Sequence, residues 1–264
     1  MSKITKGFLW ISSFWAILFG LIPLAFSLNP IEQTHPVFSP FFTISGLGSD
    51  DVGRDLLARI LHGGRIAMLL GLTSVLGSLL IGIPLGILSA WNKSWIDELI
   101  QRFTDFGLGF PSILLGVVIV TITGPGFWGL CLIILMINVP QITRLVRSLS
   151  LSELNKDYIQ GAYAIGLGNG RVITHYLLPS MKDSLIIVST TLLGTAVLEA
   201  AGLSFLGLGI MPPDPDWGSM VAEYRKYILA APHLFLFPAI SIVLFSGSYI
   251  LLAETLRKYQ RSGK

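Results

Sequence analysis

Long apolar stretches alternate along this sequence with short segments that carry most of the charged residues. A helix needs about 20 mostly apolar residues to cross roughly 30 Å of hydrocarbon. Runs free of Asp, Glu, Lys and Arg cover residues 8–31, 66–90 and 106–143, and further apolar stretches cover about 184–206 and 228–253. This pattern predicts several membrane-spanning helices.

The stretch 106–143 is too long for one crossing, because it contains 38 residues. Gly124-Pro125-Gly126 lies in its middle, and clusters of Gly and Pro mark turns. We therefore expect two helices joined by a tight hairpin, which gives six membrane-spanning helices in an all-α membrane protein. The expected organisation is a first helix with an extracellular segment (1–65), a core with helices two to six (66–253), and a cytoplasmic tail (254–264).

The first apolar run follows Lys3 and Lys6, as a secretory signal peptide would. The run of about 20 residues exceeds the usual 7–15-residue signal core, so we expect an uncleaved helix. Basic residues collect on the cytoplasmic side of membrane proteins. With the N-terminus inside, thirteen of the eighteen Lys and Arg residues lie on the cytoplasmic side. The count predicts both termini inside, with 144–183 as the largest cytoplasmic loop.

Composition supports this class. Only 12% of the residues are charged and the mean hydropathy is +0.72, whereas soluble domains carry roughly 25% charged residues. The composition excludes a soluble enzyme, a disordered protein and a nucleic-acid-binding domain. The net charge of +3 is small for binding a phosphate backbone.

The loop 144–183 contains a predicted helix, a glycine turn and a second short helix that ends at Pro179. Tyr158, Ala162 and Ile165 have the spacing of one helix face, and Gly166 can take the left-handed conformation that ends a helix. Asp157 or Asn155 is expected to cap the helix start. The pattern is typical either of a plug that fits a groove on a soluble partner or of an amphipathic loop that lies on lipid headgroups.

The spacing of Tyr158, Ala162, Gly166 and Pro179 resembles the cytoplasmic motif of permease subunits in bacterial ABC importers. In that family the loop forms a coupling helix that inserts into a cleft of the ATPase subunit. Gln160-Gly161-Ala162 stands where the family usually has Glu-Ala-Ala. The resemblance implies a coupling role for Tyr158, Gln160, Gly161, Ala162, Ile165, Gly166 and Pro179.

Other motifs are similar to the second permease subunit of the dipeptide/oligopeptide/nickel subfamily. They are Gly53-Arg54-Asp55 with Arg59 and Gly64-Arg65; Arg102 and Asp105 with Pro111; and Leu203–Gly209 followed by Pro212–Gly218. The resemblance covers residues 46 to 252, and the C-terminal end departs from the family pattern.

This resemblance implies the methionine-importer-like fold of type I ABC importer permeases, in the bacterial inner membrane. The implied partners are a second homologous permease subunit, two ATPase subunits, an extracellular substrate-binding protein and membrane lipid. The implied cargo is a peptide, nickel or a metal chelate, and the few residues before the first helix favour the nickel and metal-chelate members.

Four residues are candidates for the outer gate or the translocation path: Glu199, Gly207, Gly209 and Trp217. Glu199 is the only acidic residue in the fifth span, and intramembrane charges usually face a protein interior or a watery path. Its alternative role, which we favour, is a buried carboxyl bonded to a neighbouring helix. The two glycines would let helices approach closely, and Trp217 suits a membrane or protein interface.

No Gly-x-x-x-x-Gly-Lys-Ser/Thr motif occurs, so ATP and Mg are expected on partner subunits and this chain is not expected to be an enzyme. The four histidines have no metal-ligand spacing, and we expect no metal site. The alternative function is a stand-alone secondary transporter or channel, which would place several ionisable residues within the spans. Only Glu199 is found there.

Overall fold

The computed structural model describes residues 3–25, 28–40, 46–91 and 94–261. In chain order the helices are α1 (Lys3–Ala16), η1 (Ile17–Leu21), α2 (Ile22–Ala25), α3 (Leu56–Trp91), α4 (Trp95–Gly109), α5 (Ser112–Thr123), α6 (Phe127–Leu154), α7 (Asp157–Ala164), α8 (Asn169–Val172), η2 (Ile173–Leu177), α9 (Leu178–Phe205), α10 (Trp217–Tyr224), η3 (Arg225–Tyr227) and α11 (Pro232–Arg261). The all-α prediction is confirmed.

Four described helices are long and apolar enough to cross a membrane: Leu56–Trp91, Phe127–Leu154, Asn169–Phe205 and Pro232–Gln260. The pair α4 and α5 gives a fifth crossing if the two are taken together, and Gly7–Leu21 forms a shorter apolar helix. The six predicted spans therefore each contain a helix.

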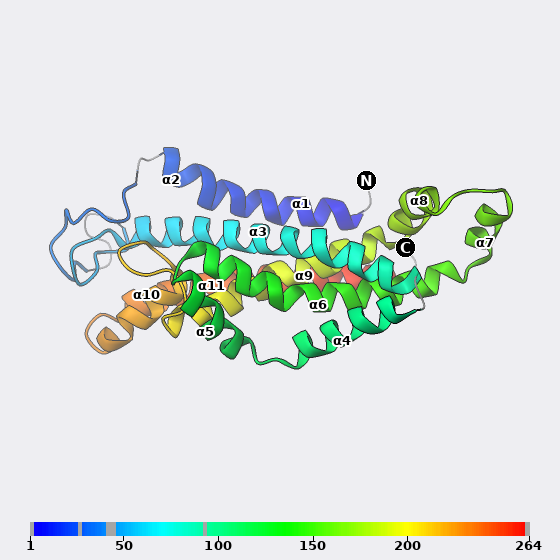
Figure 1. Cartoon of the computed structure of the whole chain (residues 1–264). Helices are drawn as coiled ribbons and strands as arrows, with labels where there is room; N and C mark the ends of the chain where they lie inside the picture. The colour runs from blue at the N-terminus through cyan, green and yellow to red at the C-terminus, as the bar shows by residue number, and fades with distance from the viewer. Residues whose placement is uncertain (1–2, 26–27, 41–45, 92–93, 262–264) are drawn as a thin grey trace.

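The long helices lie side by side along one axis (Figure 1). The segments α7 and α8 project from one end of this bundle, and α10 lies at the opposite end (Figure 1). The start of α1 and the end of α11 lie toward the end that carries α7 and α8. Any site at α7 is therefore separated from α10 by the length of the bundle.

Several helices are longer than predicted. Helix α3 begins at Leu56, ten residues before the expected position 66, so the boundary drawn at residue 65 lies within it. The charge-free run starts after Arg65, but α3 includes both Arg65 and Arg59, and the charge of Arg59 is buried and paired. Likewise α6 continues past Thr143 to Leu154, and α11 continues through most of the expected tail to Arg261. Residues 262–264 lie outside the described chain.

The third span is not the single helix expected from residue 106. Helices α4 and α5 meet at an angle of 97°. Phe110 has the extended backbone (φ −84°, ψ 127°) that a following proline, here Pro111, imposes by steric conflict with the helical conformation. The hairpin at Gly124-Pro125-Gly126 is confirmed, since both glycines have positive φ and separate α5 from α6.

Helices α3 and α6 pack closely through small residues. A Cβ placed on Gly82 would lie 2.7 Å from Cγ2 of Ile142, and one on Gly86 would lie 2.6 Å from Cβ of Val146. Glycines four residues apart allow membrane helices to approach at this distance. The pair Gly82 and Gly86 therefore supports the central helix packing.

Candidate functional site

The short helix α7 ends at a glycine turn, as the sequence predicted. Gly166 has a φ of +84°. The N–H of Leu167 donates to the oxygen of Ala162 at 3.1 Å, and the N–H of Gly166 donates to that of Tyr163 at 2.9 Å. This is the Schellman arrangement, which satisfies carbonyl groups at a helix end. We call residues 157–176 the α7 hairpin.

The inner side of the α7 hairpin is a small apolar cluster. Ile159, Ala162 and Val172 are buried and pack with Leu154 and Leu167. The single face expected for Tyr158, Ala162 and Ile165 is wrong, because Ala162 points inward while Ile165 is 75% exposed. The helix ends at Ala164, so its periodicity does not reach Ile165.

The outer side of α7 presents Tyr158, Gly161 and Ile165, all exposed. A Cβ on Gly161 would meet no atom of this chain within 4 Å. The Tyr158 hydroxyl donates to the Glu153 carboxylate, and this bond raises the pKa of Tyr158. Nε2 of Gln160 donates a hydrogen bond to the oxygen of Leu154 at 3.0 Å, so this side chain is held against the end of α6. The free surface thus combines a rigid tyrosine, an open glycine and an exposed isoleucine.

The start of α7 differs from the prediction. Lys156 occupies the N-cap position, and neither Asp157 nor Asn155 caps the helix. The side chain of Asn155 instead donates to the oxygen of Leu151. Lys156 pairs through Nζ with Glu153 at 2.6 Å, and this interaction raises its pKa.

The second half of the α7 hairpin leads straight into the fifth span. Pro179 was expected to end a short helix, but it lies in the first turn of α9, and residues 169–205 form one continuous helix. Pro179 has no N–H to donate, and it is tolerated because it follows the wider turns of the π-helix η2, where the regular i→i−4 bonding is already interrupted. The α7 hairpin is therefore joined rigidly to the helix that carries Glu199.

The opposite end of α9 closes in a second Schellman turn. Leu208 donates to Leu203 at 3.0 Å, and Gly207, with a φ of +83°, donates to Ser204 at 2.9 Å. A Cβ on Gly207 would meet nothing within 4 Å, so this glycine serves the turn and not a close approach within the chain. By contrast, a Cβ on Gly209 would lie 1.9 Å from Oγ of Ser204. Gly209 is thus packed against the end of its own helix.

Trp217 lies in the interior of the chain and not at the lipid or partner interface that its residue type suggested. Its side chain is buried where the start of α10 packs against α3, and its Nε1 donates to the oxygen of Ile60 at 2.9 Å. Asp216 caps α10 by accepting from the N–H of Ser219 at 2.9 Å, and burial raises the pKa of Asp216. A Cβ on Gly218 would lie 2.3 Å from the oxygen of Ala201, which fixes α10 against α9.

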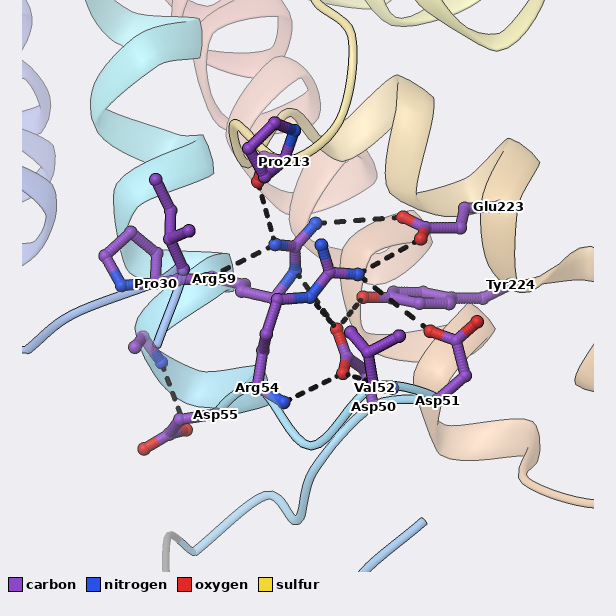
Figure 2. Close-up of polar contacts among 12 residues, drawn as sticks. Pro30, Asp50, Asp51, Val52, Arg54, Asp55, Arg59, Pro213, Glu223 and Tyr224 are labelled. Carbon is purple, nitrogen blue, oxygen red and sulfur yellow. Dashed lines mark hydrogen bonds and ion pairs between the residues drawn. The ribbon is translucent and has the colours of Figure 1, made fainter. Parts of the chain in front are cut away.

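A buried charge network ties α10 to the segment before α3. Figure 2 shows the guanidinium groups of Arg54 and Arg59 close to the carboxylates of Asp50, Asp51 and Glu223, between α3 and α10. Asp50 is fully buried at its centre and accepts from Nε of Arg54 at 2.5 Å and from the hydroxyl of Tyr224 at 3.0 Å. Arg59 lies 3.6 Å from the same oxygen.

Glu223 completes the network from α10. It lies 3.1 Å from Nη2 of Arg54 and 3.8 Å from that of Arg59, while Nη1 of Arg59 donates to the oxygens of Pro30 and Pro213. Burial opposes the charge of Arg54, but the pairing with Asp50 outweighs it and raises the pKa of Arg54. Burial also raises the pKa of Tyr224, which therefore acts as a neutral donor.

Sequence analysis identified Arg54 and Arg59 but missed their partners. Asp50 is near in sequence, whereas the hydroxyl of Tyr224 comes from 174 residues away. The only signal in the sequence for these partners was the group of charged residues at positions 50–59, in a chain that is otherwise very apolar. Within the described part of the chain, no group of three or more His, Cys, Asp or Glu side chains is placed to hold a metal ion.

Glu199 lines a cavity of about 210 Å³ between three helices. The other lining residues are Ser112, Ile113, Ile137, Gly202, Leu203 and Leu206. The buried Oε2 atom of Glu199 has no hydrogen-bond partner among the described residues. Among the described residues, the bond to a neighbouring helix that we favoured from the sequence is therefore not formed through this atom.

The chain is similar in sequence to several known transport permeases. The chain is 42% identical over 210 residues to the dipeptide transport system permease protein DppC of Alkalihalophilus pseudofirmus, covering 80% of this chain and 69% of that protein. It is 40% identical over 211 residues to the di/tripeptide transport system permease protein DppC of Pseudomonas aeruginosa, covering 80% and 70%. It is 36% identical over 211 residues to the glutathione transport system permease protein GsiD of Pectobacterium atrosepticum, with the same coverage.

Among solved structures, an inward-facing form of the MetNI methionine ABC transporter superimposes with a TM-score of 0.64 at 17% identity. The alignment covers 75% of this chain and 95% of the matched chain, so the methionine-importer-like fold expected for type I permeases is confirmed. Residues 82–261 match the family described as binding-protein-dependent transport system inner membrane component. The chain belongs to this family and is a membrane-embedded permease subunit of an ABC importer.

Proposed function

We propose that this permease imports peptides as one of two homologous permease subunits, above two ATPase subunits and below an extracellular substrate-binding protein. ATP and Mg bind to the ATPase subunits, and this chain binds neither. The importer lies in the bacterial inner membrane with both termini of this chain in the cytoplasm. Residues 1–65, 66–253 and 254–264 remain our proposed functional division.

Peptide cargo is supported by the relatives, which are named for dipeptides, di/tripeptides and glutathione. The nickel and metal-chelate cargo favoured by the short N-terminal stretch has no such support among these three relatives. The binding protein is expected to deliver the peptide to the end of the bundle that carries α10. The proposed orientation rests on the thirteen basic residues that the sequence assigns to the cytoplasmic side.

The observation that carries the mechanism is the continuous helix 169–205. If the outer side of α7 docks in a groove of the ATPase, closure of the ATPases on ATP moves the α7 hairpin. Because α9 continues directly from that hairpin, the movement reaches Glu199 and Gly207 without a flexible joint. The bundle then opens outward to accept the peptide, and ATP hydrolysis reverses the movement.

The docking residues proposed here are Tyr158, Gly161 and Ile165, which are exposed on the outer side of α7. Gln160 supports the loop through Leu154. Ala162 and Gly166 shape the α7 hairpin from inside, and Pro179 starts the span. Membrane lipid surrounds the bundle, and nucleic acid has no part in the function.

The test compares Gly161→Arg with Gly161→Ala in the complete transporter. The Cβ atom of either side chain projects into open space, so neither substitution forces a clash at that atom within the hairpin. Burying an unpaired arginine in the ATPase groove costs several kcal/mol, which lowers docking a hundredfold or more. We expect Gly161→Arg to insert normally, to co-purify poorly with the ATPase and to lose ATP-driven peptide uptake.

Gly161→Ala should retain uptake, because alanine favours the helix and adds little volume. Full uptake and full ATPase retention by Gly161→Arg would contradict docking through this face. Uptake by this chain alone in vesicles, without ATPase subunits, would instead favour the stand-alone transporter. Ala162→Arg is not a clean test, since Ala162 is buried inside the hairpin and the substitution would disrupt it.

A further inference from the structure

The cavity beside Glu199 lies where the third crossing bends. Its walls come from the start of α5 (Ser112 and Ile113), from α6 (Ile137) and from one face of α9. Broken helices in transporters commonly border the substrate site, because their free ends face a protein-lined space. The position alone is compatible with a ligand but does not identify one.

The unpartnered carboxylate identifies the charge of the ligand. Oε2 of Glu199 is buried and has no hydrogen-bond partner among the described residues. An ionised carboxylate buried without a counter-charge is costly, and acidic side chains within membrane spans therefore mark substrate or ion pathways. The start of α5, which no side chain caps, borders the same cavity. The missing partner is a cation with hydrogen-bond donors.

The shape of the cavity indicates the size of that cation. Gly202 lies one turn after Glu199 on the same helix face, and a Cβ on it would meet no atom within 4 Å. The cavity measures about 210 Å³. Complete small-molecule sites usually measure about 300–1,000 Å³. The space therefore fits one end of a peptide and not the whole molecule.

We propose that this cavity binds the N-terminal ammonium group of a peptide in transit, with Glu199 as its counter-ion. The inference rests on the proposed peptide import. An ammonium group offers three donors to a carboxylate, and every unmodified peptide has one whatever its side chains. Apart from Ser112 and Gly202, the remaining walls are apolar and would contact the neighbouring part of the peptide without selecting its sequence. They are formed by Ile113, Ile137, Leu203 and Leu206.

The binding test uses a reporter thiol in the cavity. In the complete transporter with Cys131→Ser, Gly202→Cys is labelled by a maleimide in the presence of dialanine or of propionyl-alanine. The second compound is dialanine with its ammonium group replaced by hydrogen. We expect dialanine to slow labelling at least fivefold and propionyl-alanine to have little effect. With Glu199→Gln added, protection by dialanine should be lost, and Glu199→Asp should retain part of it.

Gly247→Cys is the matched control, since Gly247 lies on α11, also has open space around it and does not line the cavity. Dialanine should leave its labelling unchanged. Equal protection of Gly202→Cys by both compounds, or protection that survives Glu199→Gln, would overturn the assignment. Loss of the second permease subunit from Glu199→Gln would also overturn it, because Glu199 would then pair with a cation of that subunit.

Uptake separates this inference from the proposed function. ATP-driven uptake of dialanine without protection of Gly202→Cys would reject the ammonium site and leave peptide import intact. Protection without uptake would reject peptide import. If both hold, Glu199→Gln should lower dialanine uptake about tenfold and leave propionyl-alanine uptake unchanged. The same binding protein delivers both compounds to both variants, so its own preference cancels in this comparison.

Discussion

The indole of Trp217 lies against Gly63, and a Cβ at position 63 would stand 2.9 Å from its Cδ1 atom. The indole Nε1 also donates to the oxygen of Ile60, on the preceding turn of α3. Phe19 packs edge-on against the same indole, with ring centroids 5.3 Å apart. One aromatic side chain thereby holds η1, α3 and α10 together at the end of the bundle opposite the α7 hairpin.

Gly63→Ala should destabilise this end of the protein. The added methyl group forces the indole to move and strains its hydrogen bond, and overpacking of this kind costs about 1–3 kcal/mol. Gly247→Ala is the control, because it adds the same atom in open space and improves helix propensity. Thermal unfolding of the purified transporter should show a lower Tm for the first variant only. Equal Tm values would mean that the indole has room to shift.

Asp50→Asn should weaken the attachment of α10 to α3. The substitution leaves Arg54 and Arg59 buried with less negative charge, and breaking a buried ion pair typically costs about 3–5 kcal/mol. Glu98→Gln removes the partner of Arg102 at an exposed pair and should change stability little. Hydrogen exchange of residues 217–227 is the direct measurement. Unchanged protection there in Asp50→Asn would contradict a stabilising role for the network.

Gly166→Ala should disturb the α7 hairpin through its backbone. An L-residue with a φ near +84° costs about 1–2 kcal/mol relative to glycine. Gly168→Ala adds the same methyl group at ordinary φ in open space and serves as the control. Limited proteolysis of residues 157–176 should be faster in Gly166→Ala alone, with weaker co-purification of the ATPase. Indistinguishable digestion of the two variants would show that the turn tolerates a side chain.

The orientation is tested with single cysteines at the two ends of the bundle. Leu229, which is 97% exposed, lies beyond α10, and Asn155 lies beside α7. In a Cys131→Ser background, a membrane-impermeant maleimide should label Leu229→Cys in intact cells and Asn155→Cys only after lysis. The opposite result would reverse the membrane orientation and place the α7 hairpin outside.

The apolar pattern alone determined the all-α membrane class, the helix within each predicted span and the hairpin at Gly124–Gly126. These features depend on local chemistry, since a lipid environment requires each spanning segment to satisfy its own backbone hydrogen bonds. The left-handed turn at Gly166 also depends on local chemistry, and the sequence therefore predicted it. The start of α3 was predicted too late for the opposite reason. The charge-free run begins after Arg65, but α3 also includes Arg59, whose charge is paired with Asp50 and with Glu223, a residue distant in sequence.

Tertiary structure alone decided which side of each helix is buried. Ala162 and Ile165 have similar positions in the sequence pattern, but the turn at Gly166 places one inside the α7 hairpin and the other outside. Trp217 has the residue type of an interface yet lies in the core, because Gly63 leaves space for its ring. The pairing of Asp50 with Tyr224 and the unpartnered Oε2 of Glu199 follow from contacts between helices far apart in sequence. Periodicity describes a single helix, whereas packing between helices determines which charges are neutralised and which remain available to a ligand.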